Sequence, residues 1–64
     1  MLFVATDSKF DIHGVYSNST KAFKNKPHNG FVVLVPSGCD KSFINGMIER
    51  RVKSGSIKSL VATE

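Results

Sequence analysis

Five consecutive apolar residues, Phe31-Val-Val-Leu-Val35, stand between Gly30 and Pro36. Three of the five are β-branched, and β-branched side chains favour strands. An uninterrupted apolar run that is bounded by glycine and proline is typical of a strand that is covered on both faces. The sequence therefore predicts a central strand over residues 31–35, and the rest of the chain has to supply the layers that cover it.

The chain is short and has one cysteine. Its 64 residues leave room for one small domain, residues 1–64. At this size folding buries only about 60% of the surface that the unfolded chain exposes. Cys39 is the single cysteine, which excludes an intramolecular disulfide and a cysteine-based zinc site within one chain. Folding must therefore rest on packing or on a partner, and the lone thiol fits a reducing, cytoplasmic location.

Two segments near the start of the sequence have strand patterns. Residues 2–5 form a short apolar run, and residues 6–9 have the composition of a turn. Residues 10–16 alternate between apolar and polar types, with Gly14 as a candidate bulge. The apolar residues predicted on one face of that strand are Phe10, Ile12 and Tyr16. We expect the two segments to pair as an antiparallel hairpin.

A short helix is predicted next, over residues 20–25. Residues 17–20 are all of types that cap helix N-termini. Pro27 ends the helix because residues before a proline avoid the helical region. Ala22 and Phe23 are expected to turn inward.

A second helix is predicted after Ser37-Gly38-Cys39-Asp40, which matches a capping pattern. Gly55 follows the last turn and suits the C-terminal cap. Gly46, in mid-helix, is expected to mark a close approach to the sheet. Spacings of one, three and four residues give the helix an apolar stripe made of Phe43, Ile44, Met47, Ile48 and Val52.

Residues 56–63 alternate enough to form a last strand. The element order is then β-β-α-β-α-β in an α+β domain. The segment from residue 31 to residue 62 has the length of a parallel crossover. We therefore expect a four-stranded mixed sheet with two helices on one face.

The positive charge is unevenly distributed. The formal net charge is +4, and no carboxylate occurs between Asp11 and Asp40. Two basic groups form the candidate surface for a protein partner or a nucleic acid: Lys21, Lys24 and Lys26, and then Arg50, Arg51 and Lys53. Such asymmetry favours an anionic partner. The simpler explanation, that the charge keeps a short chain soluble and that the second group complements a helix dipole, also stands.

Other motifs are better explained by structure than by chemistry. The segment around Lys41-Ser42 lacks the glycines of a phosphate-binding loop and places Asp40 beside the lysine. Cys39 near a helix start is interpreted as a structural thiol. His13 and His28 lack metal-ligand spacing. Phe31 is a single aromatic residue where an RNA-recognition strand needs several. No enzyme activity, metal or cofactor is predicted.

The stretch Gly14-Val15-Tyr16-Ser17, followed by Lys21-Ala22, resembles the strand-into-helix step of small phage-type accessory proteins. The resemblance implies a small module that acts through a partner and implies no catalytic residues. The sequence thus favours a non-enzymatic binding module that modulates a larger protein, as a phage-type accessory or host-modulating protein would. The alternative is a small basic nucleic-acid-binding protein. No membrane segment is expected, and sheet edges offer a route to a homodimer.

Overall fold

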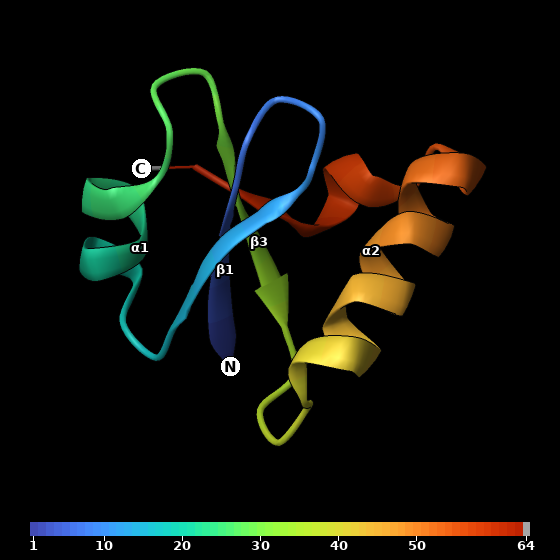
Figure 1. Ribbon diagram of the computed structural model, residues 1–64, viewed down its shortest axis with the longest axis horizontal. Helices are drawn as coiled ribbons and strands as arrows, with labels where there is room; N and C mark the ends of the chain where they lie inside the picture. Colours follow the sequence, from blue (N-terminus) through green and yellow to red (C-terminus); the bar gives the residue numbers. More distant parts are fainter. Residues whose placement is uncertain (64) are drawn as a thin grey trace.

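The computed structural model describes residues 1–63 and contains one four-stranded sheet and two α-helices (Figure 1). The sheet has the strand order β2-β1-β3-β4. The predicted α+β class and element order are confirmed. The elements are β1 (Leu2–Thr6), β2 (Ile12–Tyr16), α1 (Ser19–Asn25), β3 (Phe31–Val35), α2 (Lys41–Ser54), the 3₁₀ helix η1 (Ile57–Leu60) and β4 (Val61–Ala62).

All strand pairs in the sheet are antiparallel, so the predicted mixed sheet is wrong in this detail. Strand β1 pairs with β3 along its whole length, from Leu2 opposite Val35 to Thr6 opposite Phe31. The correction comes from the C-terminal segment. The 3₁₀ helix η1 occupies half of the predicted last strand and redirects the chain. Only Val61 and Ala62 then reach β3, and they meet it in the antiparallel direction.

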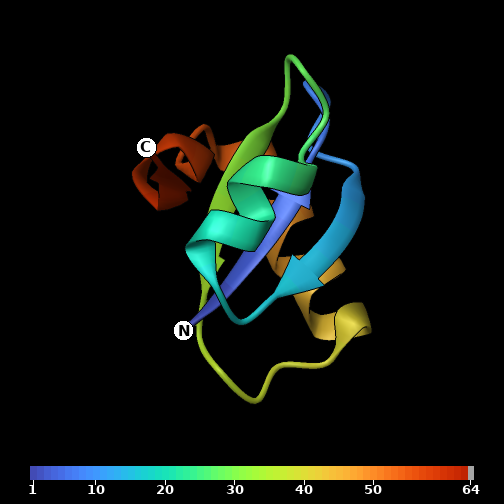
Figure 2. The same ribbon diagram turned by 90° about the vertical axis from the view of Figure 1, so that its left-hand side faces the viewer.

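The two helices cover opposite faces of the sheet, and the expectation of both on one face is wrong (Figures 1 and 2). Val4 and Val33 are paired across β1 and β3 and belong to one core cluster with Ile44 of α2. Their neighbours along the strands point the other way, toward α1. The physical reason lies in β3, whose unbroken apolar run gives both faces of the sheet apolar side chains that need cover.

The larger core cluster lies between the sheet and α2. It consists of Val4, Val33, Val35, Ile44, Ile48 and Ile57, all nearly inaccessible to solvent. On the α1 side of the sheet a smaller group is fully buried: Ala5, Ala22 and Val32. Two residues of the predicted apolar stripe lie outside the larger cluster, because Phe43 is 51% exposed and Val52 is 41% exposed. A Cβ atom added at Gly46 would meet no other atom within 4 Å, so this glycine marks no close approach to the sheet.

Both α-helices begin at side-chain caps. The side chain of Asn18 accepts a hydrogen bond from the Lys21 N–H at 3.2 Å, and Asp40 Oδ1 accepts one from the Phe43 N–H at 2.8 Å. Asp40 itself is therefore the N-cap of α2, and Ser37 lies in the preceding turn. Gly55 ends α2 in the left-handed conformation, as predicted, with φ of 77°.

The hairpin between β1 and β2 contains a bulge at His13, one residue before the predicted position. Ala5 pairs with Gly14 and Thr6 pairs with Ile12, so His13 has no direct partner on β1. The extra residue shifts the alternation within β2. Ile12 therefore packs toward the α2 core, while Tyr16 lies opposite Phe3 on the other face. The predicted common face for Ile12 and Tyr16 is wrong for this reason.

Candidate functional site

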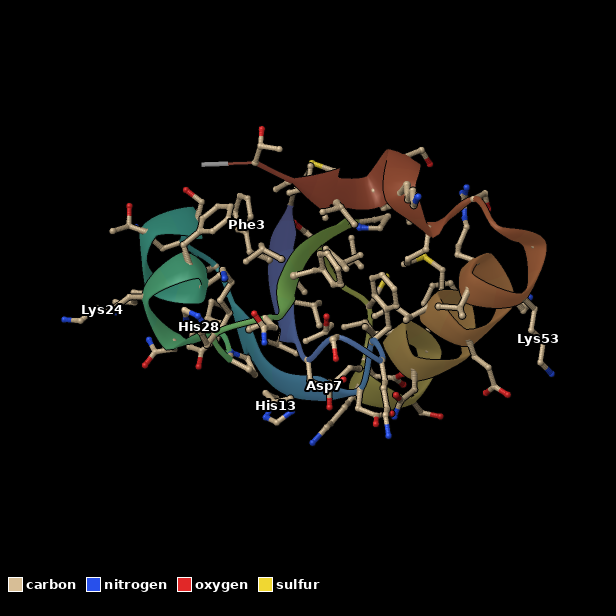
Figure 3. All side chains as sticks on the ribbon, turned by 90° about the horizontal axis from the view of Figure 1, so that it is seen from above. Phe3, Asp7, His13, Lys24, His28 and Lys53 are labelled. Atoms are coloured by element: carbon tan, nitrogen blue, oxygen red, sulfur yellow. The ribbon has the colours of Figure 1, made fainter. Side chains whose placement is uncertain are left out.

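The structure separates the two predicted basic groups. Lys21 and Lys24 lie on α1 with Lys26 just after it, whereas the second group lies on α2 across the sheet. Figure 3 shows Lys24 and Lys53 at opposite ends of the molecule, both pointing into solvent. The six residues therefore form two small patches and not one continuous basic face.

The α2 group, Arg50, Arg51 and Lys53, is explained by helix chemistry. Arg51 and Lys53 lie in the last turn, where cations interact favourably with the helix dipole. Lys53 Nζ also lies 3.7 Å from Glu49 Oε1 in an exposed pair one turn apart. All three basic residues are exposed. Their surroundings include a carboxylate, so this patch is not purely positive.

The α1 group differs because, within residues 1–63, no ion pair links its lysines to a carboxylate. Lys21 and Lys24 are three residues apart, which places them on the same side of α1, and both are exposed. Lys26 follows the last turn and is partly buried. Between Asp11 and Asp40 the sequence has no carboxylate. In the described part of the chain, the lysines of α1 therefore carry positive charge that no carboxylate pairs with.

Beside α1 the sheet has an open groove of about 590 Å³. It lies over β1, β3 and β4, beside the part of the sheet that the seven residues of α1 cover. On the opposite face α2 and η1 together cover the sheet, and Ile57 of η1 belongs to the core. One face of the sheet is thus covered by two elements and the other by one.

The floor and one wall of this groove are apolar. Phe3, Leu34 and Ala62 come from three adjacent strands, and Phe23 comes from α1. All four are only partly buried. Figure 3 shows Phe3 between α1 and the C-terminal segment. The remaining lining residues are polar: Ser19, Thr20, Lys24 and Thr63. We call this surface the α1 groove.

Sequence reasoning did not identify the α1 groove. It expected the two helices to lie together on one face. The signal was present in the strand pattern, since Phe3 and Leu34 alternate with the buried Val4 and Val33. A sheet with apolar residues on both faces, and with one short helix over one of them, has more apolar surface than that helix covers.

A second hollow of about 270 Å³ lies between the hairpin loop and α2. It is lined by charges of both signs, with Lys9 and Asp11 on the loop and Glu49 and Lys53 on α2. Phe10 also lines it, in the left-handed conformation with φ of 66°, and its ring stacks on Phe31 with centroids 4.7 Å apart. The mixed charges leave this hollow without a preference for one class of ligand.

Asp7 organises the hairpin loop. Its Oδ1 accepts hydrogen bonds from the N–H groups of Lys9 at 2.8 Å and Asp11 at 3.1 Å. Its Oδ2 lies 3.2 Å from His13 Nε2. The Asp11 N–H, with help from His13 and the Lys9 N–H, lowers the pKa of Asp7 below its ordinary value. Each bond stabilises the carboxylate in the turn, so the structure accounts for Asp7 as a loop residue.

The remaining candidates have structural explanations. Cys39 is partly buried and packs against the core cluster. Asp40 places its carboxylate at the start of α2, where a phosphate would have to bind. His13 contacts Asp7 in the hairpin loop, and residues 1–63 hold no cluster of three or more metal-ligating side chains. In that same part of the chain, neither helix has the length and apolar composition of a membrane span.

Comparison of the chain with family models, with curated proteins and with solved structures finds no match. The interpretation of the site therefore depends on its geometry alone.

Proposed function

We propose that this protein is a non-enzymatic cytoplasmic binding module that acts by docking onto a larger protein. The α1 groove is the observation that carries the proposal. Its apolar floor is continuous across three strands, and it is rimmed by Ser19, Thr20 and Lys24. An exposed apolar surface with a polar rim is characteristic of a protein-binding site.

The size of the molecule strengthens this argument. Its total accessible surface is 4233 Å². A standard protein interface buries about 800 Å² on each partner. One such interface would take roughly a fifth of this surface, which is close to the share that one side of the molecule can offer. A module this small therefore affects a partner by occupying its surface, which also agrees with the sequence resemblance to phage-type accessory proteins.

The nucleic-acid alternative has less support from the geometry. Binding to a phosphate backbone gains affinity from several cations that contact neighbouring phosphates at once. Here Lys21 and Lys24 lie across the sheet from Arg50 and Arg51. Each patch supplies three cations at most, and the α2 patch includes Glu49. We therefore place protein docking first and nucleic-acid binding second.

Photo-cross-linking in a lysate of the native host tests the proposal. Benzoylphenylalanine replaces Phe3, inside the α1 groove, or Phe43, an exposed residue on the α2 side. Both replacements conserve the aromatic ring, so each is a matched control for the other. We expect one abundant protein adduct from position 3 and none from position 43. The adduct should disappear when Leu34→Asp is added to the groove.

Three results would contradict the proposal. They are an adduct from position 43 alone, no adduct from either position, and an adduct from position 3 that persists with Leu34→Asp. Titration with labelled DNA and RNA decides the alternative. Submicromolar nucleic-acid binding at physiological salt, with the steep salt dependence of phosphate contacts, would reverse our ranking.

A further inference from the structure

We propose that the α1 groove binds an acidic amphipathic α-helix of the partner, lying alongside α1 over the floor residues Phe3, Leu34 and Ala62. The inference rests on the proposed function and specifies the partner segment. It depends on the width of the groove, on the residues that line it and on the charge beside it.

The uncovered part of the sheet is one helix wide. Neighbouring strands are about 4.8 Å apart, so two strands span about 10 Å, and an α-helix with its side chains is about 10–12 Å across. Helix α1 packs chiefly over β1 and β2 and occupies that width. Beside it, the floor residues Phe3, Leu34 and Ala62 lie on three adjacent strands and span the same width, while Val32, which also faces α1 from β3, is fully buried. A second helix would complete the layer that α1 begins.

The lining suits a helix that packs against both the sheet and α1. Phe23 projects from α1 into the groove and gives the occupant a lateral contact. Leu34 and Phe3 form the floor, and the small side chain of Ala62 lets a helix approach β4 closely.

The charge beside the groove favours an acidic occupant. Lys24 lines the groove, and Lys21 lies one turn away on the same side of α1. Among residues 1–63, those that line the groove include no carboxylate. A carboxylate on the flank of the bound helix would pair with Lys24 at the rim. A second copy of this chain fits poorly, because its α1 would bring its own lysines to the same place and its net charge is +4.

The sheet edges are less suitable for strand addition. Strand β4 has two residues, which is short of the five or six in an ordinary strand. Strand β2 has five residues, but the bulge at His13 interrupts its regular pairing pattern. Neither edge offers the long, regular row of backbone groups that an added strand or an edge-to-edge dimer needs.

Selection from a library of random 16-residue displayed peptides tests the inference. Peptides that bind the Leu34→Asp variant are first removed from the library. The remaining peptides are then selected for binding to the wild-type protein. We expect the enriched peptides to be acidic, with apolar residues at positions i, i+3 or i+4, and i+7. The most enriched peptide is then labelled with fluorescein, and its affinity is measured by anisotropy. Circular dichroism should show that it gains helicity on binding.

Two matched lysine variants test the charge. Lys24→Gln, at the rim of the groove, should weaken binding of the labelled peptide about two- to five-fold, because an exposed ion pair contributes little energy. Lys53→Gln, on the other side of the molecule, removes the same charge and should leave the affinity unchanged. An equal loss for both variants would show that only the net charge matters and would overturn a specific contact at Lys24.

The selection also distinguishes this inference from the proposed function. Enriched peptides with period-two apolar patterns, or with basic composition, would overturn the acidic helix while the groove remained the docking site. A selection without groove-dependent peptides would also overturn the inference. The cross-linking experiment would then decide the proposed function by itself, because it uses the natural partner.

Discussion

Val33 and Leu34 are neighbours on β3 that face opposite sides of the sheet, so one substitution tested at both positions distinguishes core from groove. Val33 is fully inaccessible and belongs to the α2-side core. Leu34 is partly exposed and lines the α1 groove. We expect Val33→Asp to abolish folding and Leu34→Asp to leave a folded protein that no longer docks.

The expected loss of folding stability at each position follows from how deeply the side chain is buried. Removing the Val33 side chain from the core costs about 1.5–3 kcal/mol, and a carboxylate buried there without a partner costs several kcal/mol more. A domain of 64 residues has a total stability of roughly 3–10 kcal/mol. The sum of the two losses equals or exceeds most of that range. At Leu34 the carboxylate reaches water, so the expected loss is about 1–2 kcal/mol.

Circular dichroism melts and two-dimensional NMR spectra of the two variants provide the assay. Leu34→Asp should give a cooperative melt and dispersed amide signals, whereas Val33→Asp should give neither. A cooperatively folded Val33→Asp variant would refute the assignment of Val33 to the core. An unfolded Leu34→Asp variant would refute the view that Leu34 belongs to an open groove.

Three further predictions follow from particular residues. Gly46→Ala should raise the free energy of unfolding in urea by about 1 kcal/mol, because the helical site is open, whereas Gly55→Ala should lower it by a similar amount because φ is positive there. The folded-state pKa of Asp7 is lowered, so its contribution to stability is present above its ordinary pKa of 3.8 and is lost as the pH falls through the folded-state value. Urea melts between pH 2 and pH 6, roughly the range in which carboxylates titrate, should therefore show a shallower acid dependence for Asp7→Asn, and an unchanged dependence would contradict this. Cys39→Ser should change stability by no more than about 1 kcal/mol and preserve cross-linking from position 3, and a folded variant without the adduct would give Cys39 a functional role.

The parts of the fold that depend on local sequence were predictable. The apolar run of β3 and the alternating first hairpin define strands through side-chain periodicity. Pro27 and Gly55 end the helices through backbone restrictions that act within a few residues. The bulge was placed one residue away because it depends on the register with β1, which the sequence of β2 alone does not contain.

The candidate site was not predictable to the same extent. The basic residues were recognisable, but their distribution over two patches depends on which face each helix covers. The end of the chain was predicted as a full strand, whereas Ile57 folds into η1 and covers the core. That local change leaves β4 with two residues and supplies a second cover for the α2 face. The face that a helix covers, and whether the C-terminal segment is a strand or a 3₁₀ helix, depend on competition among tertiary contacts and not on propensity within one segment.

The α1 groove follows from an imbalance between the two sides of one sheet. Because β3 is apolar on both faces, the sheet needs equal cover on each side, and the chain provides α2 with η1 on one side and α1 alone on the other. Phe3 and Leu34 keep part of their apolar surface exposed within the monomer. The same surface yields its hydrophobic free energy only when another molecule covers it. With Lys24 as the charged residue of the groove lining, that cover is best supplied by an acidic helix.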